Sequence, residues 1–490
     1  MDQAGDSLDR TWLDRIWSAL DGDPGLTERV RITGPLGLLP SVYEVGALAT
    51  ASVAAATLAV AELGARRLWT AVPDVEINRL AAAAAFRSEA LLRPVGWQAP
   101  PIWDPIAGDY QAVDGWIRLH TNYAYHRAAA LRALGLEDTD LVEREQVAAR
   151  VRRFQAQDLE QQVVNAGGCA AALHTVEEWA DHPHGTVAGG QSAIRLERRS
   201  VSVDRALPKP GVGREPGAGW EAAGGGPLAG IRVLDLTRVI AGPVCTRTLA
   251  AWGAEVLRID PPGFAEVPAL LPETTAGKHC AALDLRDDEG RFRFAALVGE
   301  ADVIVHGLRP GALTGLGFSD QALRRLNPGV CIAAIDAYGW AGPWANRRGF
   351  DSLVQFSCGI AAAGGAAAGS DRPVPLPAQA LDHATGYLLA AAICRGLTGR
   401  YDGLAPANVR GALVGTANLL IGQPVSPSEG APAEPGPGSA EPDYEALTTQ
   451  RDTFWGSVTA VPQPGTIRGA KGSWRVSAGP LGRDRPIFTV

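Results

Sequence analysis

Residues 231–260, IRVLDLTRVIAGPVCTRTLAAWGAEVLRID, are the stretch that decides the fold. The stretch begins with an apolar, β-rich run, 231–236, and passes through a loop that contains glycine and proline. Helix-forming residues follow from Val244, and a second apolar run, 255–260, closes the stretch. A short strand, a helix and a second short strand in this order form a βαβ unit, whose two strands lie parallel in one sheet.

The same alternation continues further along the chain. Apolar runs of strand length recur at 279–285, 302–305 and 330–336, and residues 288–297 have the pattern of an amphipathic helix. Strands that alternate with helices favour right-handed crossovers and a parallel sheet. We therefore predict an α/β fold with at least five parallel strands.

Composition excludes several classes of function. The chain has 490 residues, with 45 Lys and Arg against 53 Asp and Glu, so its net charge is −8. This mild acidity argues against a nucleic-acid partner or an anionic membrane surface. The most apolar stretch, residues 46–61, is short and rich in alanine, so we expect a buried helix rather than a membrane span.

The cysteines and the N-terminus indicate the compartment. The six cysteines have no Cys-x-x-Cys spacing, which argues against a disulfide framework and against a zinc site. The first residues are acidic and lack the apolar core of a signal peptide. We expect a cytoplasmic protein without a metal.

Two stretches of biased composition divide the chain. Residues 206–229 are rich in proline and glycine and predict a linker, and residues 423–443 are rich in proline, serine and glutamate and predict a flexible insertion. The units so defined are 1–205, the linker, 230–422, the insertion, and a C-terminal segment, 444–490.

The two halves of the chain resemble each other weakly. From Leu39 and again from Leu376, a Leu-Pro pair precedes a long alanine-rich helix, a polar gap and a second apolar segment. This pattern predicts a partial duplication. In the first half, residues 110–119 (YQAVDGWIRL) predict a hairpin, with Asp114-Gly115 as a type I′ turn.

Asp382 is the candidate for chemistry, and the residues around it leave two roles open. It opens an alanine-rich helix, 383–395, where an aspartate commonly caps the N-terminus. Alternatively, the helix dipole would ionise a desolvated carboxylate that attacks a thioester carbonyl. Gly364-Gly365, upstream, is either a mobile lid or a surface loop.

The loop after the first strand also has two interpretations. Residues 238–243 would present backbone N–H groups at a helix N-terminus, which suits a phosphate, and Asp260 ends the second strand as a ribose-binding carboxylate does. The loop lacks the G-x-G-x-x-G pattern, so a nicotinamide enzyme and an ordinary βα turn both remain open.

An ordered series of motifs over about 170 residues resembles the class III CoA-transferases, the family of formyl-CoA transferase, carnitine CoA-transferase and α-methylacyl-CoA racemase. The motifs are the stretch 227–260, Gly277-Lys278, LDLRDDEGR, ADVIVHGLRPGAL, AYGWAGPWANRRGFDSLVQFSCGIA, and LDHATGYLLAAAICRGLTGR.

The resemblance implies a Rossmann-like parallel-sheet large domain, a smaller α+β domain and interlocked dimers. It places the nucleophile at Asp382. The residues that it assigns to CoA are Val239, Ile240, Ala241, Arg258, Lys278, Arg309 and Arg348.

The first half also has motifs of the family, DYQAVDGWIRL and TVEEWADHPHG, so one chain holds two incomplete copies in a rearranged order. Val45 stands where the second copy has Asp382, which implies one active site per chain. Whether two chains form a homodimer or one chain closes its own ring stays open.

The function that the resemblance implies is an acyl-CoA:carboxylate CoA-transferase with an aspartyl-CoA thioester. Its partners are acyl-CoA and carboxylic acids, and the CoA thioester is a substrate rather than a permanently bound cofactor. One alternative is an acyl-CoA racemase or isomerase, although Phe350 stands where that branch has a histidine that moves protons. The other is a CoA-binding relative without catalysis.

Overall fold

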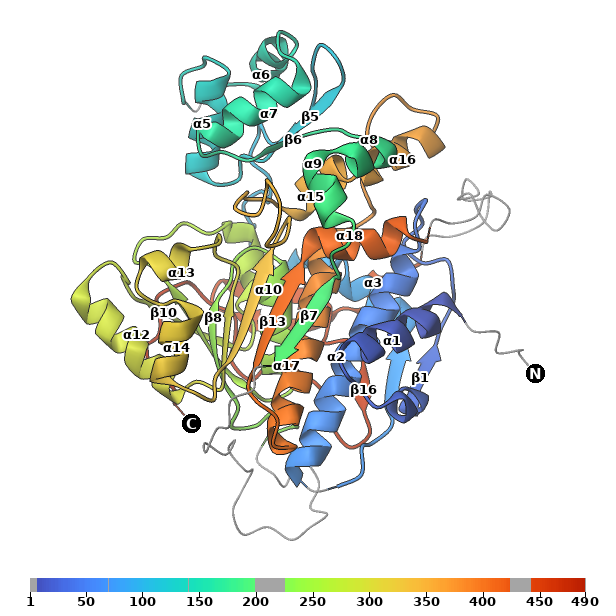
Figure 1. Cartoon of the computed structure of the whole chain (residues 1–490), viewed down its shortest axis with the longest axis vertical. Helices are drawn as coiled ribbons and strands as arrows, with labels where there is room; N and C mark the ends of the chain where they lie inside the picture. Colours follow the sequence, from blue (N-terminus) through green and yellow to red (C-terminus); the bar gives the residue numbers. More distant parts are fainter. Residues whose placement is uncertain (1–6, 69, 140, 199–224, 424–441, 490) are drawn as a thin grey trace.

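A seven-stranded sheet forms the centre of the protein (Figure 1). The computed structural model describes residues 7–68, 70–139, 141–198, 225–423 and 442–489. Most of the predicted linker, 206–229, and of the predicted insertion, 423–443, lies outside the described residues. In sheet order the strands are β10 (Lys278–Ala282), β9 (Glu255–Asp260), β8 (Arg232–Leu236), β11 (Val303–His306), β12 (Cys331–Asp336), β13 (Ala407–Ala412) and β7 (Ile194–Arg198).

The five strands predicted from the apolar runs are present and pair in parallel. The sheet has two further strands: β13 pairs in parallel with β12, and β7, from the first half of the chain, pairs antiparallel at the edge. The α/β class and the large parallel sheet are therefore confirmed.

Both faces of the sheet are buried, which explains why its central strands are rich in aliphatic residues. Along β8, Val233 belongs to the core on one face and Leu234 to the core on the other. The first core contains α10 (Ala241–Ala251) and α17 (Ala380–Tyr401), and the second contains α12 (Asp288–Glu300) and α14 (Asp320–Leu326).

Two long alanine-rich helices, α2 (Val45–Leu68) and α17, pack against each other beside the sheet (Figure 1). Their small side chains allow close approach, and Glu62 of α2 pairs with Arg395 of α17 at 2.6 Å. By length and composition α2 could cross a membrane, but 83% of its most apolar window is buried inside the protein.

The α2 helix connects two parallel strands, β1 (Val30–Thr33) and β2 (Val75–Asn78), which the short β16 (Thr466–Ile467) extends. A parallel strand pair thus accompanies each alanine-rich helix. The partial duplication itself stays a prediction.

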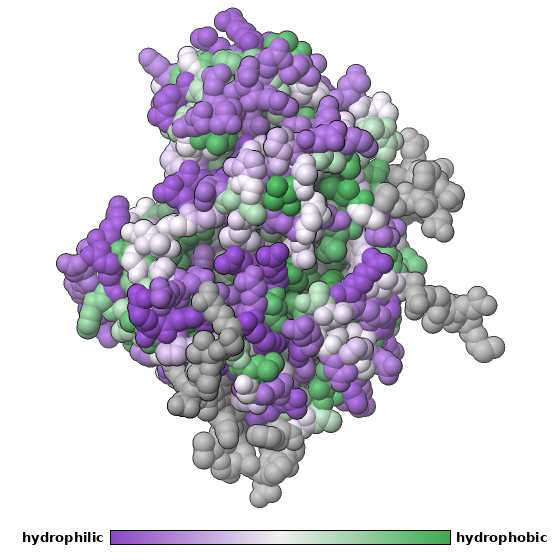
Figure 2. Space-filling model, viewed as in Figure 1, coloured by the Kyte–Doolittle hydropathy of each residue, from purple (hydrophilic) through white to green (hydrophobic). Residues whose placement is uncertain are grey.

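A smaller α+β unit lies above the sheet in Figure 1, and its visible surface in Figure 2 is mostly hydrophilic. It contains β4 (Gly108–Gln111), β5 (Trp116–Leu119), β6 (Ala170–Ala172), α5 (Ala124–Ala133), α6 (Arg144–Val151) and α7 (Ala156–Asn165). We call it the small domain.

The predicted hairpin of the small domain is present, because β4 pairs antiparallel with β5. The predicted type I′ turn is wrong: residues 112–115 form a four-residue loop, and neither Asp114 nor Gly115 has a positive φ. The Asp114 carboxylate instead accepts the N–H of Ala156 at 2.8 Å, at the start of α7.

The remaining elements surround these units. Gly364 and Gly365, expected in a lid or a surface loop, lie within the helix α16. The remaining helices are α1 (Leu8–Ala19), α3 (Arg79–Ala85), α4 (Ser88–Leu91), α8 (Val176–Asp181), α9 (Pro183–Ala188), α11 (Leu271–Thr274), α13 (Ala312–Gly315), α15 (Asp351–Ser357), α16 (Ile360–Ala367) and α18 (Leu413–Ile421). The remaining strands are β3 (Arg93–Pro94), β14 (Thr449–Thr453) and β15 (Gly456–Ala460).

Candidate active site

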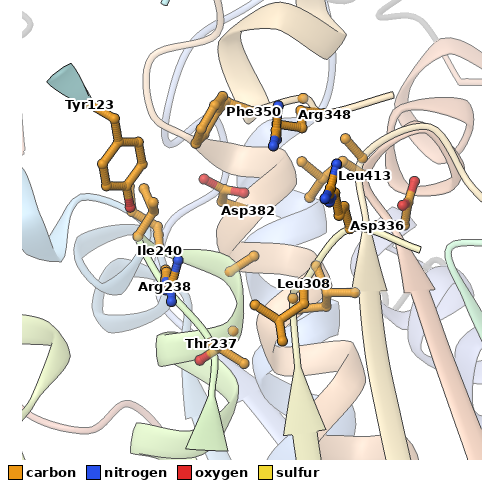
Figure 3. Close-up of a pocket in the computed structure, with 18 of the residues that line it drawn as sticks. Tyr123, Thr237, Arg238, Ile240, Leu308, Asp336, Arg348, Phe350, Asp382 and Leu413 are labelled. Carbon is orange, nitrogen blue, oxygen red and sulfur yellow. The ribbon is translucent and has the colours of Figure 1, made fainter. Parts of the chain in front are cut away.

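A cavity of about 290 Å³ contains Asp382 and lies where the strands of the central sheet end (Figure 3). Ligand sites of open parallel sheets form at the carboxyl ends of the strands. The part of the chain that forms the central sheet contributes the loop 237–242 after β8, residues 335–337 at the end of β12, and residues 347–350, together with Leu308, Arg309 and Leu413. The small domain contributes Tyr123, Tyr125 and His126.

Asp382 does not cap its own helix. The α17 helix begins at Ala380, so Asp382 lies in its first turn. The carboxylate of Asp351 accepts the N–H groups of Leu381 at 2.8 Å and of Asp382 at 3.0 Å. Asp351 therefore performs the capping role that the sequence left open for Asp382, and the Asp382 carboxylate remains available to the cavity.

The protonation of Asp382 differs from the expectation that the helix dipole would ionise it. Only 7% of the residue is exposed. Burial, followed by the negative charges of Asp351 and Glu89, raises the pKa of Asp382 well above its ordinary value. Desolvation and like charges thus outweigh the helix dipole at this carboxyl group.

Asp351 and Glu89 are held by polar contacts around the start of α17. Burial raises the pKa of Asp351 to about 6, although its carboxylate accepts hydrogen bonds from backbone N–H groups and from Gln355. Glu89, in the first half of the chain, contacts His383 Nε2 at 2.9 Å. Both halves of the chain therefore contribute to the surroundings of the candidate nucleophile.

The loop after β8 brings Val239, Ile240 and Ala241 to the same cavity as Asp382. Val239 has a φ of +65°, a left-handed conformation that is rare for a β-branched residue. Its N–H donates to Glu266 Oε2 at 3.3 Å. The sequence predicted this loop as a CoA contact, and that role stays a prediction.

Arg309 and Arg348 also line the cavity, and Arg348 donates to the carbonyl of Gly167 in the small domain at 3.2 Å. Arg258 and Lys278 do not line it. Their side chains are fully buried, and each is paired with a carboxylate on a neighbouring part of the sheet. Their assignment to CoA also stays a prediction.

Those buried pairs stabilise the base of the loop. Lys278 Nζ contacts Asp235 Oδ2 at 2.9 Å, and Asp235 Oδ1 accepts the N–H of Thr237 at 2.8 Å. Arg258 donates to Asp260 at 2.8 Å and to Glu266 at 3.1 Å. Asp260 thus has a structural partner at the position where a dinucleotide enzyme binds ribose.

Aromatic side chains cover Asp382 from the small-domain side. Phe350 lies beside Asp382 in Figure 3 and stacks on His120, with ring centroids 3.6 Å apart. Burial lowers the pKa of His120 to about 3 and that of His126 to about 4. Both imidazoles are therefore neutral near pH 7, and this wall of the cavity carries no imidazolium charge.

Several site residues were missed by sequence reasoning. Tyr123, Tyr125 and His126 belong to the other half of the chain, and nothing local distinguishes them. Asp336 had a usable signal, because it ends a predicted parallel strand, as Asp260 does. Within the described residues, no group of three or more His, Cys, Asp or Glu side chains has the arrangement of a metal site.

Comparisons with known proteins give the family. Residues 228–461 match the model of CoA-transferase family III. The chain is 29% identical over 308 residues to the acetyl-coenzyme A transferase nodX of Hypoxylon pulicicidum, which covers 61% of this chain and 51% of that protein. It is 34% identical over 195 residues to formyl-CoA:oxalate CoA-transferase of Escherichia coli, which covers 36% and 45%.

A third relative is the probable fatty acyl-CoA transferase Rv3272 of Mycobacterium tuberculosis, 32% identical over 36% of this chain and 47% of that protein. A crystal structure of Rv3272 covers 39% of this chain and 56% of its own, with a TM-score of 0.35 and 31% identity. The chain spans about half the length of these relatives. The sequence resemblance is confirmed: the region 228–461, which carries Asp382 and most of the cavity wall, matches CoA-transferase family III.

Proposed function

We propose that the protein is an acyl-CoA:carboxylate CoA-transferase that works through a covalent thioester between Asp382 and CoA. The observation that carries the proposal is the division of roles at the start of α17. Asp351 accepts the helix N–H groups, while the Asp382 carboxylate lies in a cavity inside the family region. A buried carboxylate without a capping role is suited to nucleophilic attack.

The proposed cycle balances without another reactant. The Asp382 carboxylate attacks the carbonyl of the donor acyl-CoA, which gives a mixed anhydride and releases CoA thiolate. The thiolate attacks the aspartyl carbonyl, which gives the aspartyl-CoA thioester and the free donor acid. An acceptor carboxylate then attacks this thioester, and the released thiolate attacks the acceptor carbonyl of the new anhydride. These last steps form the new acyl-CoA and restore Asp382.

The chain's own residues support this chemistry in two ways. The neutral aromatic wall formed by Phe350 and Tyr123, with His120 stacked on Phe350 outside the cavity lining, limits the access of water to an anhydride or thioester on Asp382. The loop 239–241 places backbone and apolar side chains beside the carboxyl group, where the pantetheine arm of CoA would lie.

Trapping tests the proposal. The protein is incubated with a panel of acyl-CoA donors, treated with hydroxylamine or borohydride, and digested for mass spectrometry. The expected result is a modification on Asp382 only. The Asp382→Asn variant should lose the modification and the transfer activity but keep its affinity for CoA. Asp402→Asn, at the other end of α17, is the matched control and should react normally. A protein that binds CoA but gives no modification with any donor would contradict the proposal and support the non-catalytic alternative.

One observation favours a second candidate, an acyl-CoA racemase or isomerase. His126 lines the same cavity as Asp382, so a second titratable side chain borders the space that an acyl group would occupy. This activity would incorporate deuterium at the α-carbon of an acyl-CoA in heavy water without an acceptor acid. The transferase would not incorporate deuterium under those conditions.

We further propose that the site is complete within one chain and that the compartment is the cytoplasm. The first half supplies Tyr123 and His126, and the second half supplies Asp382. All six cysteines are buried and unpaired, as expected in a reducing compartment. We keep the five-unit division of the chain as a proposal about its domains.

A further inference from the structure

A single buried carboxylate, Glu266, joins three parts of the candidate site. Only 5% of the residue is exposed. Its Oε1 accepts the hydroxyl of Tyr123, in the small domain, at 2.6 Å. Its Oε2 accepts the N–H of Val239, in the cavity loop, at 3.3 Å and a guanidinium N–H of Arg258, in the central sheet, at 3.1 Å. The side chain therefore connects the small domain, the loop and the sheet.

The loop that Glu266 holds has an unfavourable backbone conformation. Valine rarely adopts a φ of +65°, because its branched Cβ crowds the backbone there, and such a residue persists only where its surroundings hold it. Ile240 and Ala241, which follow directly, lie beside Asp382 in the cavity and begin α10. A relaxation of Val239 would move these two residues relative to Asp382.

The contact from the small domain falls on the same carboxylate. Tyr123 is buried, and its ring points toward the loop that carries Arg238 and Ile240 (Figure 3). Burial, and then the charge of Glu266, raises the pKa of Tyr123, so its hydroxyl stays protonated and donates. The position of the small domain and the conformation of the loop thus depend on one another through Glu266.

We propose that Glu266 is a positioning residue: it holds Val239 in its left-handed conformation and fixes the loop to Tyr123, so that the loop and the small domain enclose Asp382 as one unit. This inference rests on the proposed function. It adds that the small domain sets the geometry of the reacting group rather than only covering the cavity. Neither Glu266 nor Tyr123 transfers a group or a proton in this role.

Two conservative variants test the proposal. Glu266→Gln keeps the size of the side chain but removes its charge and one of its two acceptor oxygens, so it can no longer accept both the Val267 N–H at one end and the N–H groups of Val239 and Arg258 at the other. Tyr123→Phe removes only the hydroxyl. Because a displacement of about 1 Å can cost 100-fold in rate, we expect each variant to slow thioester formation on Asp382 by about 10- to 100-fold at saturating acyl-CoA. The Kd for CoA should change less than about threefold, since a positioning defect falls on the rate rather than on binding.

Matched controls exist outside the cavity. Tyr110→Phe removes another buried small-domain hydroxyl, which donates to the carbonyl of Ile106 at 2.7 Å. Glu62→Gln alters another buried carboxylate, which pairs with Arg395 at 2.6 Å, far along α17 from the loop. Both controls should lower the melting temperature but leave the rate of thioester formation within about twofold, because their stability loss does not reach the loop.

A rescue variant and an exchange measurement separate this inference from the proposed function. Glycine adopts a left-handed φ without cost, so Val239→Gly in the Glu266→Gln background should recover a large part of the lost rate. Amide hydrogen exchange over residues 238–244 should rise in Glu266→Gln and in Tyr123→Phe but not in Tyr110→Phe, whether or not the protein turns over. A wild-type protein that forms no thioester would overturn the proposed function, and the exchange result would still decide the role of Glu266. Unchanged exchange in both variants, or an equal loss of rate in Tyr110→Phe, would overturn this inference.

Discussion

The Asp336→Asn substitution should make the protein more stable above neutral pH, and the structure gives the size of the effect. Asp336 ends β12 at the cavity, and its Oδ1 accepts the N–H groups of Tyr338 at 2.8 Å and Gly339 at 2.7 Å. Burial raises its pKa from 3.8 to about 7 in spite of these two bonds. Asparagine keeps the accepting oxygen and removes the ionisation.

The direction of the effect follows from proton binding. Between about pH 4 and pH 7 the folded protein keeps a proton on Asp336 that the unfolded chain has released. The unfolded state therefore binds fewer protons in this range, and the free energy of unfolding falls as the pH rises. A pKa difference of one unit between the folded and the unfolded state corresponds to about 1.4 kcal/mol. The pKa of Asp336 rises by about three units, so its ionisation lowers the free energy of unfolding by about 4 kcal/mol at pH 8. Most of that cost, about 3 kcal/mol, develops between pH 5 and pH 8.

Urea unfolding followed by tryptophan fluorescence, at pH 5, 6, 7 and 8, measures this difference. The stability advantage of Asp336→Asn over the wild type should grow by about 3 kcal/mol across the series. Asp284→Asn is a suitable control, because hydrogen bonds from Arg286 lower the pKa of Asp284 to about 2, outside the range tested. Parallel curves for Asp336→Asn and the wild type would refute the reasoning.

Three further predictions concern the helices around the cavity. A Cβ on Gly386 would meet a backbone oxygen of α10 at 2.5 Å, so Gly386→Ala should lower the free energy of unfolding by about 1–3 kcal/mol and weaken CoA binding in calorimetry. A Cβ on Gly299 would have no such neighbour within 4 Å, so Gly299→Ala should change neither quantity. Glu62→Leu leaves the Arg395 guanidinium buried without its carboxylate and should lower the free energy of unfolding in urea by about 3–5 kcal/mol. Adding Arg395→Met to Glu62→Leu should recover most of this loss. An equal loss in the single and the double variant would contradict the prediction. Because the pKa of Asp382 is raised and only its ionised form attacks, the rate of thioester formation should still rise with pH above the range in which an ordinary aspartate ionises. A rate that falls as the pH rises would contradict Asp382 as the nucleophile.

The central sheet was predictable because of where it lies. Strands that are buried on both faces are rich in aliphatic residues, so β8, β9, β11 and β12 are visible as short β-rich runs, although β8 and β9 also hold charged residues in buried ion pairs. β13 includes Asn408 and Arg410, and β7 alternates charged and apolar residues as an edge strand does. Such strands can be recognised only from their neighbours in the sheet, which lie far away in the sequence.

The candidate site was predictable only in its local part. The loop 239–241 and Asp382 each belong to a continuous motif, whereas Tyr123 reaches Glu266 across 143 positions of the chain. Charged residues inside strands illustrate the same limit. Lys278 was predicted to meet a ligand, but sequence alone does not show that Asp235, on a strand not adjacent to its own, faces it.

At the start of α17 one carboxylate, Asp351, caps the helix and another, Asp382, is the proposed nucleophile. This arrangement determines that the proposed cycle begins with the loss of a proton from Asp382. With Asp351 as the cap, Asp382 is free to react, but the neighbouring charge and burial keep its proton in place. The nearby imidazole of His126 has a pKa of about 4, so it cannot hold that proton at pH 7. The proton must therefore leave Asp382 for an acceptor other than His126 before the carbonyl is attacked. This order predicts that the rate of thioester formation rises with pH as the neighbouring carboxyl groups of Asp382 and Asp351 ionise together.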